Sequence, residues 1–149
     1  MTDRTRGYAH RVDVAATAPV VWSALTTSAS LCEWCSPGAE IDARQGGSLR
    51  ASVDRVTEFE AHIDVYLPGR RMRLIHLPSP DLPSTDCTLV DDLVLEAGAR
   101  SSIVRLLGGG VPSDSAWDLI YLRMRRGWER ALARLKVYVE RESPRSVAR

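Results

Sequence analysis

Two cysteines separated by two residues, Cys32 and Cys35, form the first pair of side chains in this sequence that can do chemistry. Such a pair can hold zinc or act as a redox dithiol. A structural zinc site needs four ligands, and the third cysteine, Cys87, and the three histidines are scattered along the chain. A dithiol of the thioredoxin type needs a βαβ setting, which the element order does not provide. We therefore expect small apolar cysteines and no bound metal, with a redox or metal role left as the alternative.

Carboxylates and histidines supply the candidate acids and bases. Asp91 and Asp92 are adjacent in a predicted strand, so their side chains face opposite ways and cannot share a substrate. One of them can point inward, where burial would raise the pKa of the carboxylate and let it act as a base. His76 lies on a strand with alternating neighbours and can also point inward, whereas His62 has polar neighbours and is expected to be exposed. No serine-hydrolase, zinc-protease or P-loop motif is present.

Length and composition exclude several classes of protein. The 149 residues suffice for one domain with a sizeable core, and no apolar run approaches the roughly 20 residues of a membrane span. A net charge of +1 gives no electrostatic case for binding nucleic acid or an anionic membrane. The polar N-terminus predicts no secretory signal, and an odd number of cysteines fits a reducing compartment. We expect a cytoplasmic protein with no cofactor.

The elements that must position these side chains begin with a strand over residues 8–15. Two short helices follow, over 18–26 and 28–34, where Thr17 and Ser28 can act as caps. Turn signals then divide a β meander between residues 39 and 107, and Gly108-Gly109-Gly110 is expected to end the sheet as a flexible link that can gate a cavity. The expected strands of the meander are 40–44, 48–53, 56–67, 71–77, 85–96 and 101–107.

The last third of the chain has a helical period from about 114 to 142. Ser113, Asp114 or Ser115 can cap this helix, and Ser115-x-x-Asp118 matches a capping box. Gly127 in mid-helix indicates either a bend, a close approach or a tolerated glycine. One broad side is apolar, and it consists of Trp117, Ile120, Tyr121, Met124, Trp128, Ala131, Leu132, Leu135, Tyr138 and Val139.

Arginines occupy the opposite side of this helix. They are Arg123, Arg126, Arg130, Arg134 and Arg141. A solvated outer face is the simplest interpretation of such a stripe. The alternative is a docking surface for an acidic partner.

The order of strand, two short helices, antiparallel meander and long C-terminal helix resembles the helix-grip fold of the START-like (SRPBCC) superfamily, which includes the birch-pollen-allergen type. The sequences ATAPVVWSALT (16–26), LCEWCSPG (31–38) and DARQGGSLR (42–50) resemble the first half of the heat-shock chaperone ATPase activator homologue family. The sequences ARSSIVRLLGGGVP (99–112) and GWERALARLKVYVE (127–140) resemble its second half. The resemblance implies one α+β domain over residues 1–149, with a curved antiparallel sheet of six or seven strands around a helix over about 114–142 and a flexible tail over 143–149.

The same resemblance implies a cavity between the long helix and the sheet. Large or adaptable side chains and a few polar groups are its expected lining. The alternative is a filled core with no cavity. The candidate ligand-binding residues are Trp34, His76, Asp91, Arg105, Trp117, Tyr121, Met124 and Trp128.

Three functions follow from the resemblance. The first is binding of a small hydrophobic molecule, such as a lipid, a polyketide or an aromatic metabolite, and the sequence favours it over catalysis. The second is an enzyme of the polyketide cyclase or dehydratase type. The third is a chaperone-regulating module that binds protein through its arginine face. A homodimer is a further expectation.

Overall fold

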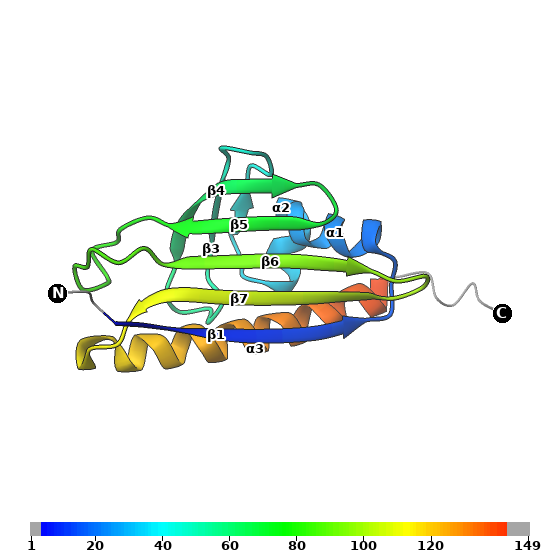
Figure 1. The fold of residues 1–149 in the computed structure, drawn as a ribbon. Helices are drawn as coiled ribbons and strands as arrows, with labels where there is room; N and C mark the ends of the chain where they lie inside the picture. The colour runs from blue at the N-terminus through cyan, green and yellow to red at the C-terminus, as the bar shows by residue number, and fades with distance from the viewer. Residues whose placement is uncertain (1–3, 143–149) are drawn as a thin grey trace.

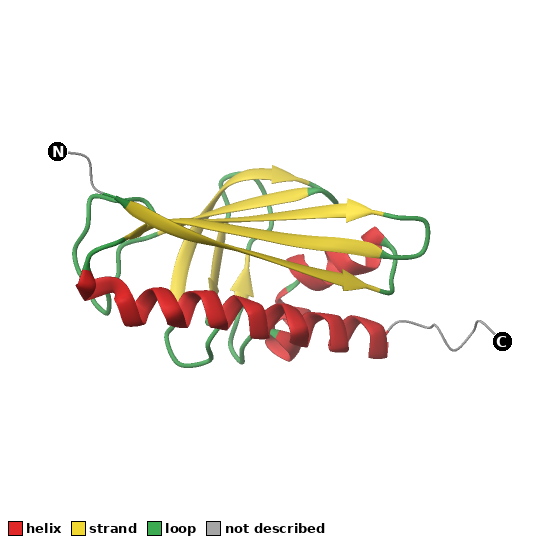
Figure 2. Ribbon diagram, turned by 60° about the horizontal axis from the view of Figure 1, so that its bottom comes forward, coloured by secondary structure: helices red, strands yellow, loops and turns green. Residues whose placement is uncertain are grey.

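The computed structural model describes residues 4–142, which form an antiparallel sheet folded over one long helix (Figures 1 and 2). In these residues the sheet has seven strands in the order β1-β7-β6-β5-β4-β3-β2. This arrangement confirms the α+β helix-grip fold, whereas the expected tail over 143–149 lies outside the described residues. The elements are β1 Thr5–Val14, α1 Ala18–Thr26, α2 Ser28–Trp34, β2 Glu40–Ile41, β3 Ser48–Ala51, β4 Phe59–Leu67, β5 Arg71–His76, β6 Val90–Ala97, β7 Ser102–Pro112, the 3₁₀ turn η1 Ser115–Trp117 and α3 Asp118–Glu142.

Helix α3 runs beneath the concave face of the sheet along its whole length (Figure 2). Its apolar side packs against the sheet, with Trp128, Leu132 and Leu135 at most 3% exposed. Other predicted members of that side are only partly buried, and they are Ile120, Tyr121, Met124 and Tyr138. The facing side chains of the sheet alternate along each strand, so that Met72 and Leu74 of β5 are also buried. Apolar side chains recur about every 3.6 residues in the helix and every two residues in the strands, so the two elements face each other with apolar surfaces and form one shared core.

The helix ends use caps that differ in part from those predicted. Asp114 caps the start of the C-terminal helical segment, because its carboxylate accepts a hydrogen bond from the amide of Ala116 at 3.1 Å. The Ser115-x-x-Asp118 box is not the cap, since Asp118 pairs with Arg6 at 2.8 Å. Ser28 begins α2 without capping it, and its hydroxyl instead accepts from the amide of Ile41 at 3.0 Å.

The three glycines of residues 108–110 lie inside β7, which corrects the prediction that they end the sheet as a flexible link. Tyr8 and Gly108 are partners across β1 and β7, and a Cβ on Gly108 would lie 2.2 Å from the Tyr8 ring. The ring occupies the space that any other side chain at 108 would need. The glycine therefore serves packing within the sheet.

Two strands, β4 and β6, start later than predicted at the same end of the molecule. Strand β4 starts at Phe59 because the Asp54 carboxylate accepts the amides of Val56 and Thr57, each at 2.8 Å, which closes a turn. Strand β6 starts at Val90, after a loop over 77–89 that contains several prolines. The loops 52–58 and 77–89 thus face the first half of α3.

Gly127 is a point of close approach. A Cβ at this position would lie 3.0 Å from Cγ2 of Val53 and 3.2 Å from the amide of Asp54. The missing side chain lets the 52–58 loop approach a continuous helix, which confirms the close-approach alternative. No helix within residues 4–142 is long and apolar enough to cross a membrane.

Candidate functional site

A cavity of about 500 Å³ lies between the first half of α3 and the loops at the adjacent end of the sheet. This volume falls within the range of small-molecule pockets in proteins. Its apolar wall combines residues of α3, β4 and the two loops. The apolar lining residues are Val53, Val56, Phe59, Leu77, Leu82, Ile120, Met124 and Trp128.

The cavity opens to solvent through an apolar and acidic rim. Val56 is 81% exposed and Leu77 is 43% exposed, although both are large apolar side chains. Charged lining residues are Asp54, Glu58, Asp81 and Arg123. Burial raises the pKa of Asp54, but hydrogen bonds from the Thr57 and Val56 amides and the Ser52 hydroxyl outweigh it, so the pKa lies below its ordinary value.

His76, the last residue of β5, brings a polar group to the inner wall of the cavity. Its Nε2 lies 2.6 Å from Oδ2 of Asp91, which is completely buried. The Phe59 ring stacks on the imidazole, with centroids 4.7 Å apart and planes 27° apart. Nδ1 of His76 has no hydrogen-bond partner among residues 4–142, and His76 is one of the residues that line the cavity.

Tyr8 completes a buried polar chain behind His76. Its hydroxyl donates to Oδ1 of Asp91 at 2.6 Å. Burial, with the nearby Asp91 carboxylate, raises the pKa of the Tyr8 phenol far above its ordinary value, while hydrogen bonding with Trp128 acts weakly in the opposite direction. Tyr8 therefore keeps its proton and acts as a donor to Asp91.

Strand register brings these three side chains together. Gly108 of β7 lies between Tyr8 of β1 and Asp91 of β6 as the registered partner of both. On the other side of β6, Asp91 is paired with Leu74, two residues before His76 on the same face of β5. The chain of hydrogen bonds thus crosses four neighbouring strands, and it needs a glycine at its centre.

A smaller hollow of about 190 Å³ lies against the other side of the 77–82 segment. It shares His76, Leu77, Ser79 and Leu82 with the larger cavity, and Trp117 forms part of its wall. The imidazole therefore lies at the boundary of two hollows. Of the predicted site residues, His76, Met124 and Trp128 line the larger cavity, Asp91 lies behind it, and Trp117 borders the smaller one.

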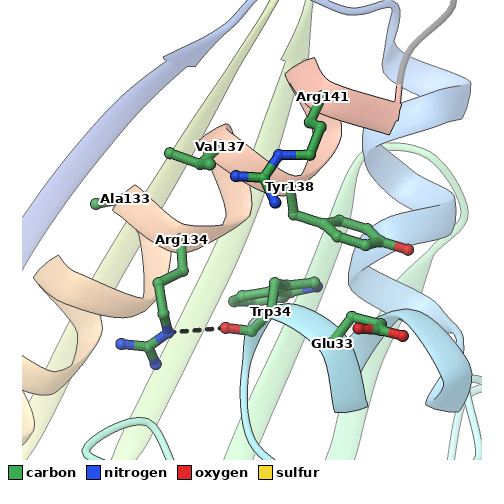
Figure 3. Close-up of a pocket in the computed structure, with 7 residues that line it drawn as sticks. All are labelled: Glu33, Trp34, Ala133, Arg134, Val137, Tyr138 and Arg141. Carbon is green, nitrogen blue, oxygen red and sulfur yellow. Dashed lines mark hydrogen bonds between the residues drawn. The ribbon is translucent and has the colours of Figure 1, made fainter.

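Trp34 lies elsewhere, in a surface groove between α2 and α3 (Figure 3). Its side chain is nearly buried, and its indole donates to the carbonyl of Ala24 at 2.8 Å, which indicates a structural role. Arg134 crosses the groove and donates to the carbonyls of Trp34, Cys35 and Val53 at 2.8 to 3.2 Å. This corrects the assignment of Arg134 to the solvated arginine stripe, because its guanidinium holds the C-terminal end of α2.

Two further predicted residues do not line the large cavity. Arg105 points from β7 to the outer face of the sheet, where it pairs with Glu96 at 2.6 Å, because its neighbours Val104 and Leu106 face inward. Tyr121 lies near the start of α3, where its hydroxyl donates to the carbonyl of Gly7 at 2.6 Å. Asp92 faces outward and pairs with Arg71, which confirms that the adjacent aspartates do not share a site.

Burial governs the chemistry of Cys35, the most buried of the three cysteines. Cys32, Cys35 and Cys87 are free, and burial raises the pKa of the Cys35 thiol to about 11 despite the opposing effect of Arg134. Within residues 4–142, no three His, Cys, Asp or Glu side chains gather as a possible metal site. Cys35 therefore stays a neutral thiol at ordinary pH.

Sequence reasoning missed Tyr8 as part of the site. Tyr8 and Asp91 are 83 residues apart, and no local pattern connects them. The signal in the sequence was Gly108, which is the one residue type that leaves room for the tyrosine ring. The role of Gly108 can be recognised only when the register of β1, β7 and β6 is known.

The fold is shared with several solved bacterial proteins. Protein MLL2253 from Mesorhizobium loti is similar with a TM-score of 0.77 and 15% identity, over 93% of this chain and 99% of that one. The Aha1 dimer from Colwellia psychrerythraea is similar with a TM-score of 0.73 and 17% identity, over 91% of this chain and 96% of that one. CalU16 from Micromonospora echinospora is similar with a TM-score of 0.71 and 20% identity, over 97% of this chain and 80% of that one. No curated protein matches the chain significantly.

A bent antiparallel sheet around a long C-terminal helix, with two short helices after β1, defines a START-like (SRPBCC) protein of the helix-grip type. Within that superfamily, residues 15–140 match the model of the Activator of Hsp90 ATPase homolog 1-like protein family. The chain belongs to this family, as its sequence motifs predicted.

Proposed function

We propose that this protein binds a small hydrophobic molecule in the cavity between α3 and the sheet. The observation that carries the proposal is an open cavity of about 500 Å³ with a largely apolar lining and one inward imidazole. Burial of apolar surface favours such a guest by about 25 cal/mol per Å² removed from water. The exposed Val56 and Leu77 at the rim supply apolar surface along the path of entry.

The test is titration with Nile red, a neutral dye whose fluorescence rises in apolar surroundings. We expect saturable binding of one dye per chain. Met124→Trp places an indole in the cavity and should weaken binding at least about tenfold, the change that 1.4 kcal/mol produces. Leu119→Trp is the matched control, because Leu119 lies on the same helix, is 72% exposed and does not line the cavity. Equal, unsaturable signals from all three proteins would contradict the proposal.

Catalysis of the polyketide cyclase or dehydratase type is the second candidate function. The observation in its favour is the 2.6 Å pair of His76 and Asp91, since a histidine oriented by a carboxylate is a common general base. In this case His76→Gln should abolish turnover of an aromatic polyketide substrate while Nile red still binds. Binding without turnover favours the first function.

A chaperone-regulating role is the third candidate, and it is supported by family membership and by the exposed Arg126 and Arg130 on α3. Arg126→Glu with Arg130→Glu should then disrupt a complex that Met124→Trp leaves intact. The Colwellia relative was solved as a dimer, and a homodimer stays a prediction for this chain.

A further inference from the structure

The proton on the His76 imidazole has a position fixed by its buried partners. An ionised carboxylate accepts hydrogen bonds but donates none, and the two oxygens of Asp91 lie 2.6 Å from the Tyr8 hydroxyl and from Nε2 of His76. Tyr8 occupies Oδ1 as a donor, since its raised pKa keeps its phenol protonated. Oδ2 is then left to accept the Nε2 proton of His76.

The neutral imidazole with its proton on Nε2 carries a lone pair on Nδ1. This nitrogen has no partner among residues 4–142, and His76 borders both hollows. The side chain is only 7% exposed, so water has little access to the imidazole although the cavity opens to solvent. In such surroundings an unmatched acceptor is costly, and a donor that reaches it gains more than it would in water.

The surroundings of Nδ1 select the kind of donor. The Phe59 ring stacks on the imidazole, and Met124 and Trp128 line the same cavity, so a flat aromatic guest fits beside them. Asp54, Glu58 and Asp81 outnumber Arg123 around the cavity and disfavour an anionic guest. The oxygens of an ionised carboxylic acid would also be repelled by the lone pair on Nδ1, because neither group has a proton to donate.

Resting on the proposed function, we infer that the guest is a neutral aromatic compound with a weakly acidic hydroxyl, a phenol or an enol, which donates its hydrogen bond to Nδ1 of His76. Asp91 and Tyr8 act as positioning residues, because they fix which imidazole nitrogen accepts. An acidic hydroxyl is a stronger donor than an aliphatic alcohol, which adds selectivity for this class.

The test compares 2-naphthol with 2-methoxynaphthalene at about pH 8, where an ordinary imidazole is neutral. The two compounds share the ring system, and the ether has no proton to donate. We expect the wild-type protein to bind 2-naphthol roughly tenfold more tightly, the effect of one net hydrogen bond. His76→Phe should remove this preference, so that the two naphthalenes bind this variant with similar affinity.

Asp91→Asn probes the positioning residues. Tyr8 would still donate to the side-chain oxygen, so the asparagine amide would donate to Nε2 and move the imidazole proton to Nδ1. This variant should then bind 2-naphthol no more tightly than 2-methoxynaphthalene. Asp92→Asn is the matched control, because Asp92 is on the outer face with Arg71, and it should keep the wild-type preference.

Imidazole ¹⁵N chemical shifts test the same inference in the unmodified protein. In the free state Nε2 should be protonated and Nδ1 should be of the unprotonated type, and 2-naphthol should shift Nδ1. Equal affinity for both naphthalenes in a protein that binds Nile red would overturn this inference and leave the proposed function standing. A protonated Nδ1 in the free protein would also overturn it. Failure of all three probes to bind would overturn the proposed function.

Discussion

Cys35 illustrates how burial decides the chemistry of a single residue. The C-x-x-C spacing is compatible with a reactive dithiol, but the Cys35 thiol is buried and contacts the carbonyl of Ser52 at 3.9 Å. Burial in apolar surroundings disfavours the thiolate, and thiolate is the reactive form. The low reactivity expected from the missing partners therefore has a direct physical cause.

This raised pKa makes stability depend on pH in the alkaline range. The unfolded thiol ionises near pH 9.0, whereas the native thiol stays neutral until about 11. The unfolded state therefore binds fewer protons in this window, and the free energy of unfolding should fall by up to about 1.4 kcal/mol per pH unit as pH rises. Urea unfolding between pH 9 and 10 should show a steeper decrease for the wild-type protein than for Cys35→Ala.

A second buried group also contributes to the pH dependence of stability in alkaline solution. Tyr8 also has a raised pKa, so its ionisation in the unfolded state adds to the slope above about pH 10. Because Tyr8 is present in both proteins, its contribution cancels, and the difference between their slopes reports on Cys35. Parallel curves for wild type and Cys35→Ala would show that the native thiol ionises as easily as the unfolded one.

Strand β7 contributes to the site through glycines, which leave space for neighbouring groups. Gly108 accommodates the Tyr8 ring, and Gly110 has a positive φ of 78° and a Cβ direction blocked by the carbonyl of Thr88. Gly109 between them has open space beside it. The three glycines therefore differ in what substitution would cost, although they look equivalent in the sequence.

Gly108→Ala should destabilise the protein by about 3 kcal/mol, because the new methyl group displaces the Tyr8 ring and breaks its hydrogen bond to Asp91. Gly109→Ala is the matched control and should change the free energy of unfolding by less than about 0.5 kcal/mol. Chemical denaturation measures both. Similar effects of the two substitutions would refute the packing role of Gly108.

Arg134 connects parts of the whole molecule that are far apart in sequence. It extends from α3 to the end of α2, where it donates to the carbonyl of Trp34 (Figure 3). It also donates to the carbonyl of Val53 in the loop that forms a cavity wall. Burial and the nearby Arg55 lower its pKa below the ordinary value of arginine, yet its hydrogen bonds to three carbonyls keep it in place. The helix and the 52–58 loop are thus held by one side chain.

Arg134→Met should lower the free energy of unfolding by about 2 kcal/mol, because three carbonyls lose a charged donor while the apolar stem is retained. Nile red affinity should also fall, since the 52–58 loop loses an anchor. Arg130→Met on the exposed part of the same helix provides the comparison and should change neither quantity. An unaltered Arg134→Met protein would show that the carbonyl contacts contribute nothing to stability.

The sequence by itself determined the class of fold, because the buried face of α3 and the alternating strands depend on hydrophobic periods that are local in the chain. It also predicted that His76 and one of Asp91 and Asp92 can face inward, since alternation along a strand is local too. Strand register, in contrast, is a tertiary property, and it alone joined Tyr8 to Asp91 across Gly108. For the same reason Trp34 lies outside the cavity, because which neighbour a side chain meets depends on how the elements pack.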